Sequence, residues 1–222
     1  MAFLGKNVAV SISTPSVTMS EKVWTSLGFS VIEQKSNEVF LSDGQLLLNL
    51  VEQEFFSPAV CYYGTSSLHT NRESVVGPDR EILFIRKPEP EYARLPLTGE
   101  KNSILGFFDA VAVGSPNHRT AREWSETLGF FVQEEFGGTY PQSEVTDGLI
   151  NVSFRNGLNG RFLCYVRDLD DDDAHQILTT AQQIQSDHGA SRGQIVRDAN
   201  GDILMVVIYT AEGTGIIISQ DL

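Results

Sequence analysis

Two charged residues, Asp109 and Arg161, occupy predicted strand positions from which a side chain could do chemistry. The stretch 107–113 alternates so that Asp109 shares one strand face with two valines, and the stretch 161–166 places Arg161 on one face with Tyr165. A charge on a mostly apolar face needs a partner, which is the other charge, a further protein group or a ligand. Asp109 is therefore the candidate for a general acid or base, and Arg161 for a polar anchor of a bound molecule.

Aromatic residues supply further candidates for the wall of a ligand cavity. Tyr62, Tyr63 and Tyr165 each offer an aromatic face together with a hydroxyl group. Trp124 lies in a stretch with helical spacing, which favours a place in the core over a place on a cavity wall. We keep all four residues as candidates for contact with a small organic ligand.

The residue types that usually bind metals do not form a recognisable set. Cys61 and Cys164 are isolated in strand-like runs, which favours small buried side chains over a disulfide or a nucleophile. We expect surface positions for the histidines, because none of them is spaced as zinc ligands are: His69, His118, His175 and His188. We therefore predict no bound metal and no cofactor.

The net charge of the chain limits the classes of molecule that it could bind. The chain has 222 residues, of which 29 are acidic and 16 are basic, with a formal net charge of −13. An acidic chain disfavours nucleic acid, whose phosphates need Lys and Arg, and it disfavours an anionic membrane surface. No apolar run reaches the roughly 18 residues of a membrane span, and we find no secretory signal. We expect a cytoplasmic protein whose partner is a small organic molecule, with a homodimer as a further option.

The order of motifs near the start of the chain recurs in its second half. The stretches 8–29 and 109–130 both run from an apolar strand through a proline into a helix that ends in Leu-Gly-Phe. Each half then carries an Asp-Gly pair between apolar runs, at Asp43 and at Asp147, which signals a hairpin turn. Two copies of one unit predict a pseudo-symmetric protein with a pocket between or within the halves.

Each half reads as a strand, a helix and three or more strands joined by tight turns. We therefore predict an α+β fold of two tandem βαβββ modules, with mixed, mostly antiparallel, curved sheets related by a pseudo-twofold. Thr18 or Ser20 is the expected N-cap of the first helix. The expected boundaries are a first module over 1–87, a proline-containing linker over 88–103, a second module over 104–210 and an extended tail over 211–222.

This arrangement resembles the vicinal oxygen chelate superfamily, which includes glyoxalase I, bleomycin-resistance proteins and extradiol dioxygenases. The resemblance rests on the helices that run into Leu-Gly-Phe and on the strand and turn 162–169 that lead into a helix. It rests also on Asp-Ala-Asn-Gly-Asp at 198–202, which is similar to the Asp-Pro-Asp-Gly-Asn hairpin of the family. The likeness spans nearly the whole chain except the linker and the tail.

The resemblance implies a metal site in many members, typically held by a His early on the first strand, a His or Gln opening a later strand, and a Glu on the last strand. This chain departs from that pattern, because Arg, Phe and Met do not ligate hard or borderline divalent ions. The matched positions hold, in order, Asn7 or Val8 and Asp109, then Pro58 or Ala59 and Arg161, and finally Phe84 and Met205. Phe84 and Met205 thereby join the candidates for a cavity wall.

The resemblance without its metal ligands implies a glyoxalase-like, metal-free, small-molecule binding protein of the bleomycin-resistance kind. The alternative is a metal-independent, or unexpectedly metal-dependent, lyase, isomerase or dioxygenase of the same superfamily. For a metal-independent reaction Asp109 is the candidate acid or base. A third option is a role in binding another protein chain.

Overall fold

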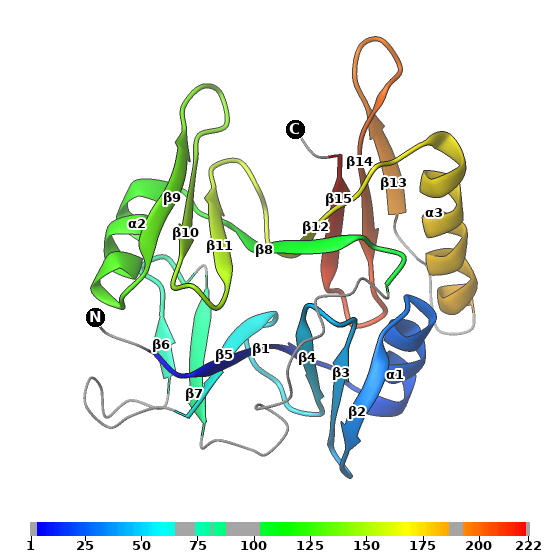
Figure 1. Cartoon of the computed structure of the whole chain (residues 1–222), viewed down its shortest axis with the longest axis horizontal. Coiled ribbons are helices and arrows are strands. Elements are labelled where there is room, and N and C mark those ends of the chain that lie inside the picture. Colours follow the sequence, from blue (N-terminus) through cyan, green and yellow to red (C-terminus); the bar gives the residue numbers. More distant parts are fainter. Residues whose placement is uncertain (1–3, 65–73, 81, 88–102, 187–192, 221–222) are drawn as a thin grey trace. The chain divides into compact units, whose positions relative to one another are not determined.

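The computed structural model describes residues 4–64, 74–80, 82–87, 103–186 and 193–220 (Figure 1). The described part of the first half contains the helix α1 (Val17–Ser26) and the strands β1 (Asn7–Ser13), β2 (Ser30–Gln34), β3 (Glu38–Ser42), β4 (Leu47–Val51), β5 (Ala59–Tyr63), β6 (Ser74–Val76) and β7 (Leu83–Lys87). The described part of the second half contains the helices α2 (His118–Thr127) and α3 (Asp171–Ser186) and the strands β8 (Phe107–Gly114), β9 (Phe131–Phe136), β10 (Gln142–Thr146), β11 (Asn151–Arg155), β12 (Arg161–Val166), β13 (Gly193–Arg197), β14 (Ile203–Tyr209) and β15 (Gly215–Ser219).

The described strands form two mixed sheets. Their strand orders are β2-β3-β4-β1-β5-β7-β6 and β13-β14-β15-β12-β8-β11-β10-β9. Strands joined by tight turns pair antiparallel, as β3 does with β4 and β10 with β11. Parallel pairs join β5 to β7, β8 to β11 and β12 to β15. This topology confirms the α+β class with mixed, mostly antiparallel sheets.

The β-α-β-β-β order recurs within the halves of the chain. The elements β1, α1, β2, β3 and β4 complete it within residues 7–51. In the second half, β8-α2-β9-β10-β11 is followed directly by β12-α3-β13-β14-β15. In both of these later repeats the first strand pairs parallel with the last. The expectation of tandem βαβββ modules is confirmed, and the structure shows a repeat shorter than half the chain.

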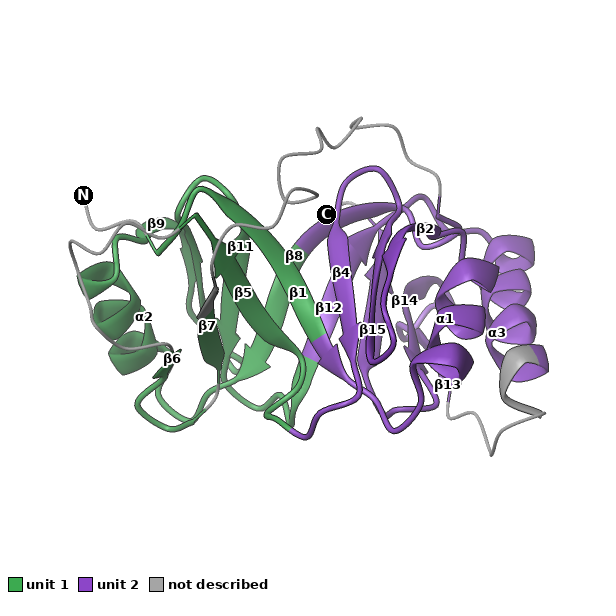
Figure 2. Ribbon diagram, turned by 90° about the horizontal axis from the view of Figure 1, so that it is seen from below, with its two compact units in different colours: residues 1–11, 55–96, 110–161 green, residues 12–54, 97–109, 162–222 purple. Residues whose placement is uncertain are grey.

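The chain forms two compact units, and each unit draws on both halves of the sequence (Figure 2). Unit 1 comprises residues 1–11, 55–96 and 110–161, and unit 2 comprises residues 12–54, 97–109 and 162–222. Unit 1 contains α2 with β5–β7 and β9–β11, whereas unit 2 contains α1 and α3 with β2–β4 and β12–β15. Both units therefore combine segments of the expected modules 1–87 and 104–210.

The helices of each unit cover its strands through small and apolar side chains. In unit 2, α1 and α3 lie side by side (Figures 1 and 2). Val23 and Trp24 of α1 and Ala174 and Ile177 of α3 are buried. In unit 1, α2 packs against β9, β10 and β11. Within the described residues, no helix combines the length and the apolar character that crossing a membrane requires.

The first helix begins earlier than the sequence suggests. Its N-cap is Ser16, not Thr18 or Ser20, and Ser16 Oγ accepts a hydrogen bond from the backbone N–H of Met19 at 3.4 Å. This bond satisfies one of the N–H groups that the first helical turn leaves without a partner. Ser20 is instead buried within the helix.

The segment 211–222, expected to be an extended tail, contains β15 inside a sheet. This strand pairs antiparallel with β14 and parallel with β12. Its three isoleucines, 216–218, are buried and show no polar alternation, as expected for a strand covered on both faces. The expected linker over 88–103 lies outside the described residues, except for Ser103.

Glu212, in the turn between β14 and β15, connects the end of unit 2 to α1. Its carboxylate accepts hydrogen bonds from Trp24 Nε1 at 2.9 Å and from Ser20 Oγ at 3.0 Å. Trp24 is fully buried, and its ring meets Phe29 edge-on with the centroids 5.1 Å apart. Because Trp24 and Ser20 are shielded from water, Glu212 is the group that satisfies their donors.

We expect Glu212→Gln to lower the free energy of unfolding by about 1–3 kcal/mol, because an amide cannot accept both hydrogen bonds through equivalent charged oxygens. Urea unfolding measures the loss. A double-mutant cycle with Trp24→Phe should give losses smaller than the sum of the two single variants, because both remove the same hydrogen bond. Additive losses would contradict this role of Glu212.

Candidate functional site

The turn between β3 and β4 places a carboxyl group inside unit 2. Asp43 Oδ1 accepts hydrogen bonds from the backbone N–H groups of Gln45 at 3.0 Å and of Leu46 at 2.8 Å. These bonds fix the side chain, which is 1% exposed. The second oxygen, Oδ2, is buried and has no hydrogen-bond partner among the described residues. Oδ1 of this carboxylate therefore stabilises the turn, whereas Oδ2 is available to a further hydrogen-bond donor.

Tyr165, in β12, holds a second unpartnered polar atom in the same unit. Its side chain is fully buried, and its ring meets Phe108 of β8 edge-on with the centroids 5.5 Å apart. Its hydroxyl has no hydrogen-bond partner in the part of the chain that the structure describes. The pKa of this phenol lies well above its ordinary value of 10.0, because burial, and after it the negative charge of Asp43, disfavour the phenolate.

Gln45 and Ser103 add two further buried polar atoms. Gln45 Oε1 accepts a hydrogen bond from the backbone N–H of Phe108 at 2.9 Å, whereas its Nε2 has no partner among the described residues. The Ser103 hydroxyl likewise has none there. The Ser103 segment is anchored by the backbone N–H of Ile104, which donates to Leu27 O at 3.0 Å. We call the following four residues the polar cluster: Asp43, Gln45, Ser103 and Tyr165.

A glycine allows this segment to approach the strand that carries Tyr165. Gly106 has a φ of +106°, and a Cβ at this position would lie 2.4 Å from Val166 O and 2.7 Å from Arg167 Cβ. Arg167 Nη1 in turn donates to Ile104 O at 2.6 Å. The segment 103–106 is thus held against β12 by contacts that no other residue type at position 106 would allow without a shift of the backbone.

Burial raises the pKa of the Asp43 carboxyl above its ordinary value. Removal from water is the largest cause, and the backbone N–H groups of Leu46 and Gln45 and the Ser103 hydroxyl oppose it. The Ser103 hydroxyl therefore lies near enough to lower the pKa of the Asp43 carboxyl, although its oxygen does not make a hydrogen bond of good geometry. No cation of the described residues contributes to this pKa.

Unit 1 holds the same pair of residue types in a closed form. Asp147, in the turn between β10 and β11, accepts hydrogen bonds at Oδ1 from the backbone N–H groups of Leu149 at 2.9 Å and Ile150 at 3.1 Å. Its Oδ2 accepts a hydrogen bond from the Tyr62 hydroxyl at 2.7 Å. Tyr62 in β5 corresponds to Tyr165 in β12, because each follows a cysteine in its strand. Here both carboxylate oxygens are satisfied.

The two units therefore differ in the hydrogen bond between the aspartate of the turn and the tyrosine of the strand. In unit 2 the oxygen and the hydroxyl that would form it are both buried and have no partners among the described residues. Each such group costs about 1–3 kcal/mol unless another molecule bonds it. The polar cluster offers an anionic acceptor at Asp43, two hydroxyls that donate or accept, and an amide donor at Gln45. Such a set can recognise a small polar molecule by several hydrogen bonds.

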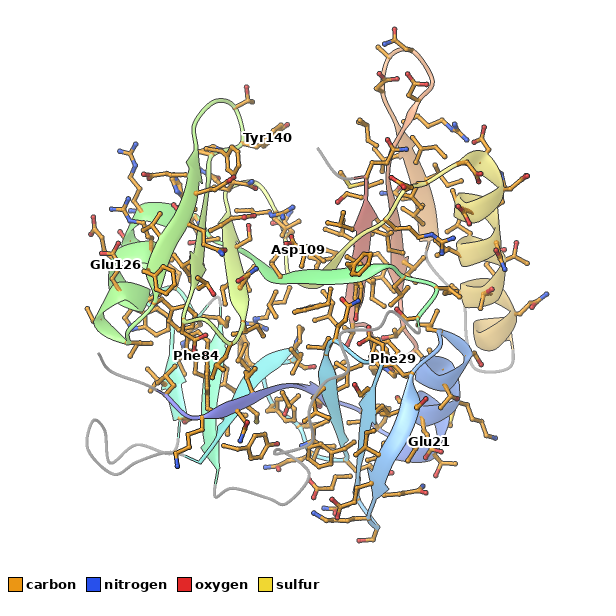
Figure 3. The ribbon with its side chains drawn as sticks, viewed as in Figure 1. Glu21, Phe29, Phe84, Asp109, Glu126 and Tyr140 are labelled. Atoms are coloured by element: carbon orange, nitrogen blue, oxygen red, sulfur yellow. The ribbon has the colours of Figure 1, made fainter. Side chains whose placement is uncertain are left out.

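Three residues expected to line a cavity come together in unit 1 as a packed aromatic group. The Phe84 ring stacks on Trp124 with the centroids 5.7 Å apart and on Phe130 with the centroids 5.4 Å apart. It also meets Tyr62 edge-on at 6.0 Å. Figure 3 labels Phe84 where it projects from β7. These rings fill part of the core of unit 1.

The two charged candidates, Asp109 and Arg161, lie in different units. Figure 3 labels Asp109 in β8, where it follows Phe108. Successive side chains of a strand point to opposite faces of the sheet, so Asp109 does not share the face of the Phe108 ring that contacts Tyr165.

The guanidinium of Arg161 is held by protein groups in unit 1. It donates to Arg80 O at 2.7 Å and to Ser57 O at 3.4 Å, and it lies over the Phe56 ring, 4.5 Å from the centroid.

The positions that match the family's metal ligands do not fit a metal ion. Phe84 belongs to the aromatic group, and the Arg161 guanidinium is itself a cation. Met205 is half-buried in β14, and Tyr63, the remaining cavity candidate, is buried in β5. Within the described residues, no group of three or more His, Cys, Asp and Glu side chains is arranged to hold an ion.

The expected surface position is wrong for His118. Its side chain is buried, and Nδ1 lies 2.8 Å from Ser143 Oγ of β10. The physical reason is that α2 packs against β10, which places the first residue of the helix against the sheet. His175 is exposed as expected. His69 and His188 lie outside the described residues.

Sequence reasoning identified Tyr165 but missed the residues around it. The pattern indicates only a hairpin turn at Asp43, the start of a strand at Gln45 and the end of the linker at Ser103. The signal that could have found Asp43 is the repetition of both an Asp-Gly turn and a Cys-Tyr pair in the two halves.

We expect different stability effects from removal of the two tyrosine hydroxyls. Tyr62→Phe should lower the free energy of unfolding by about 1–3 kcal/mol, because Asp147 Oδ2 loses its partner. Tyr165→Phe should cause no loss in the ligand-free protein, because its hydroxyl has no hydrogen-bond partner in the described part of the chain. Urea unfolding of both variants at neutral pH makes the comparison, and equal losses would contradict the difference between the units.

Asp43→Asn should increase stability at neutral pH. A carboxyl whose folded-state pKa is raised favours folding when protonated, and this contribution is lost as the pH rises through the folded-state value. The advantage of the variant should therefore shrink as the pH falls toward and below 3.8, the ordinary value for Asp. Unfolding free energies at several pH values test this, with Asp147→Asn as the matched control that should lose stability.

Comparisons with known proteins agree on the fold. No protein-family model and no curated protein matches the sequence. Among solved structures, the chain is similar to homoprotocatechuate 2,3-dioxygenase from Arthrobacter globiformis, with a TM-score of 0.61 and 16% identity over 99% of this chain and 80% of that one. It is also similar to an Mn(II)-bound glyoxalase from Novosphingobium aromaticivorans, with a TM-score of 0.57 and 12% identity over 100% of this chain and 83% of that one. The chain therefore has the fold of the vicinal oxygen chelate superfamily.

Proposed function

We propose that this chain is a small-molecule binding protein that holds its ligand in unit 2 without a metal ion. The observation that carries the proposal is the open Asp43–Tyr165 pair, set beside the closed Asp147–Tyr62 pair of the same chain. Both pairs sit on equivalent turns and strands, so the fold permits the hydrogen bond in either place. A pair that is left open at a cost in stability is typical of a site selected for binding.

The surroundings of the open pair support recognition of an organic molecule. The Phe108 and Tyr165 rings supply apolar surface beside the polar cluster. Ligand sites combine such surface with a small number of placed polar groups. The net charge of −13 disfavours nucleic acid and anionic membranes as partners. Cys61 and Cys164 are both buried cysteines, which suit a reducing compartment, and we expect the cytoplasm.

A second candidate function is a metal-independent enzyme, and one observation favours it. Asp43 is a buried carboxyl with a raised pKa beside a phenol, a pairing that can move a proton to or from a bound substrate. Asp109, the candidate that the sequence offers, is a further proposal for this role. A lyase or an isomerase needs only such proton transfers, whereas a dioxygenase would need a redox centre.

Thermal unfolding in the presence of EDTA tests the binding function. The full chain is screened against small ammonium, alcohol, amide and carboxylate compounds, and at least one class should raise the Tm. At a ligand concentration of about 100 times the Kd, binding adds about 2.7 kcal/mol to the free energy of unfolding. Asp43→Asn should lose most of the Tm shift.

The matched control is Asp147→Asn, which should keep the shift because its turn lies in unit 1. A screen with no stabilising compound, or a shift that requires an added divalent metal, would overturn the proposal. NMR of each stabilising compound after incubation separates the two functions. An unchanged spectrum supports binding, and a new product supports the enzyme.

A further inference from the structure

We infer that the polar cluster binds a protonated primary amine, with the ammonium group at Asp43. This inference rests on the proposed function and names the class of its ligand. It concerns unit 2 alone, where all four residues of the cluster lie.

The charge of Asp43 is the first reason. Its side chain is 1% exposed, and its Oδ2 has no hydrogen-bond partner among the described residues. An ionised carboxylate in such a place is costly unless a positive charge accompanies it. The described residues supply no cation that acts on it. A ligand that brings a positive charge therefore gains more from this site than a neutral ligand of the same size.

The number of acceptors is the second reason. An ammonium group has three N–H donors and no acceptor. The cluster presents three oxygen atoms without partners in the described part of the chain: Asp43 Oδ2, Ser103 Oγ and Tyr165 OH. The turn that carries Asp43 meets β8 and β12, because Gln45 accepts the Phe108 N–H at 2.9 Å and the Phe108 ring contacts Tyr165. The segment that carries Ser103 meets the same strand, because Gly106 lies against Val166 O, next to Tyr165.

The remaining groups of the site suit the rest of such a molecule. Phe108 and Tyr165 form an edge-on ring pair, and aromatic rings attract organic cations as well as their apolar chains. Gln45 Nε2 offers donors to a hydroxyl or carbonyl farther along the ligand.

Other ligand classes fit this arrangement less well. An anion would be repelled by Asp43. A divalent metal would require several ionised or imidazole ligands, and the described residues hold no such group. A neutral alcohol could donate to Asp43, but it would leave the buried charge uncompensated. An inorganic ammonium ion shares the chemistry of the amine, and a separate arm of the experiment distinguishes the two.

Isothermal titration calorimetry with n-butylammonium chloride tests the inference on the full chain, dialysed into EDTA at neutral pH. Butan-1-ol and sodium butyrate are the neutral and anionic probes of matched length. We expect saturable binding of n-butylammonium and at least about tenfold weaker binding of the two matched probes, because each lacks the charge that pairs with Asp43. Ammonium chloride should bind more weakly than n-butylammonium, because it makes no contact with the rings.

The variants locate the amine within the cluster. Asp43→Asn keeps the acceptor that holds the turn and should weaken n-butylammonium binding by at least about tenfold. Tyr165→Phe keeps the ring and should weaken it by a smaller factor. Asp147→Asn and Tyr62→Phe, the equivalent changes in unit 1, should leave the Kd unchanged.

Each result bears on the inference. Equal binding of ammonium chloride and n-butylammonium would keep the ammonium site and overturn the organic amine. Binding that sodium chloride reproduces, or that Asp43→Asn retains, would overturn the site itself. If an alcohol or amide binds at Asp43 while the amine does not, the ligand class is wrong and the proposed function stands. If no compound binds, both are wrong.

Discussion

A carboxylate has two oxygens, and the Asp-Gly turn of this fold uses one of them. At Asp43 and at Asp147, Oδ1 holds the turn by accepting two backbone N–H groups. The other oxygen then needs a partner of its own wherever water is excluded. The two units differ in the partner of this second oxygen. In unit 1 a tyrosine hydroxyl donates to this oxygen, whereas in unit 2 the oxygen has no partner among the described residues.

Because the βαβββ element is repeated, the chain contains two copies of the Asp–Tyr pair, and the two copies can differ. One copy of the Asp–Tyr pair retains its hydrogen bond and contributes stability, so the other copy is free to lose it. Each pair joins residues from both halves of the chain, because Tyr62 meets Asp147 and Tyr165 lies near Asp43. A change at either Asp–Tyr pair therefore affects a unit that is built from both halves of the chain.

The sequence predicts the class of fold because the strand patterns and the Leu-Gly-Phe helix ends are local signals. It does not predict β10, whose residues Gln142–Thr146 are mostly polar, and it predicts an extended tail where the structure has β15, because a short apolar run does not show which strands it pairs with. The site was harder to predict. Tyr165 is recognisable from strand alternation, but its nearness to Asp43 depends on which repeat packs with which, and repeats of similar pattern do not encode that choice locally.

Each unit contains segments from both halves of the chain, and this has a consequence for synthesis on the ribosome. The strands β2–β4 are made before residues 162–222, which unit 2 also requires. Glu212, which satisfies the buried donors of Trp24 and Ser20, is made 188 residues after Trp24 and 192 residues after Ser20. A fold whose essential contacts span such sequence separations has a high contact order and folds slowly. Until Glu212 is made, the donors of Trp24 and Ser20 in α1 therefore remain without this partner.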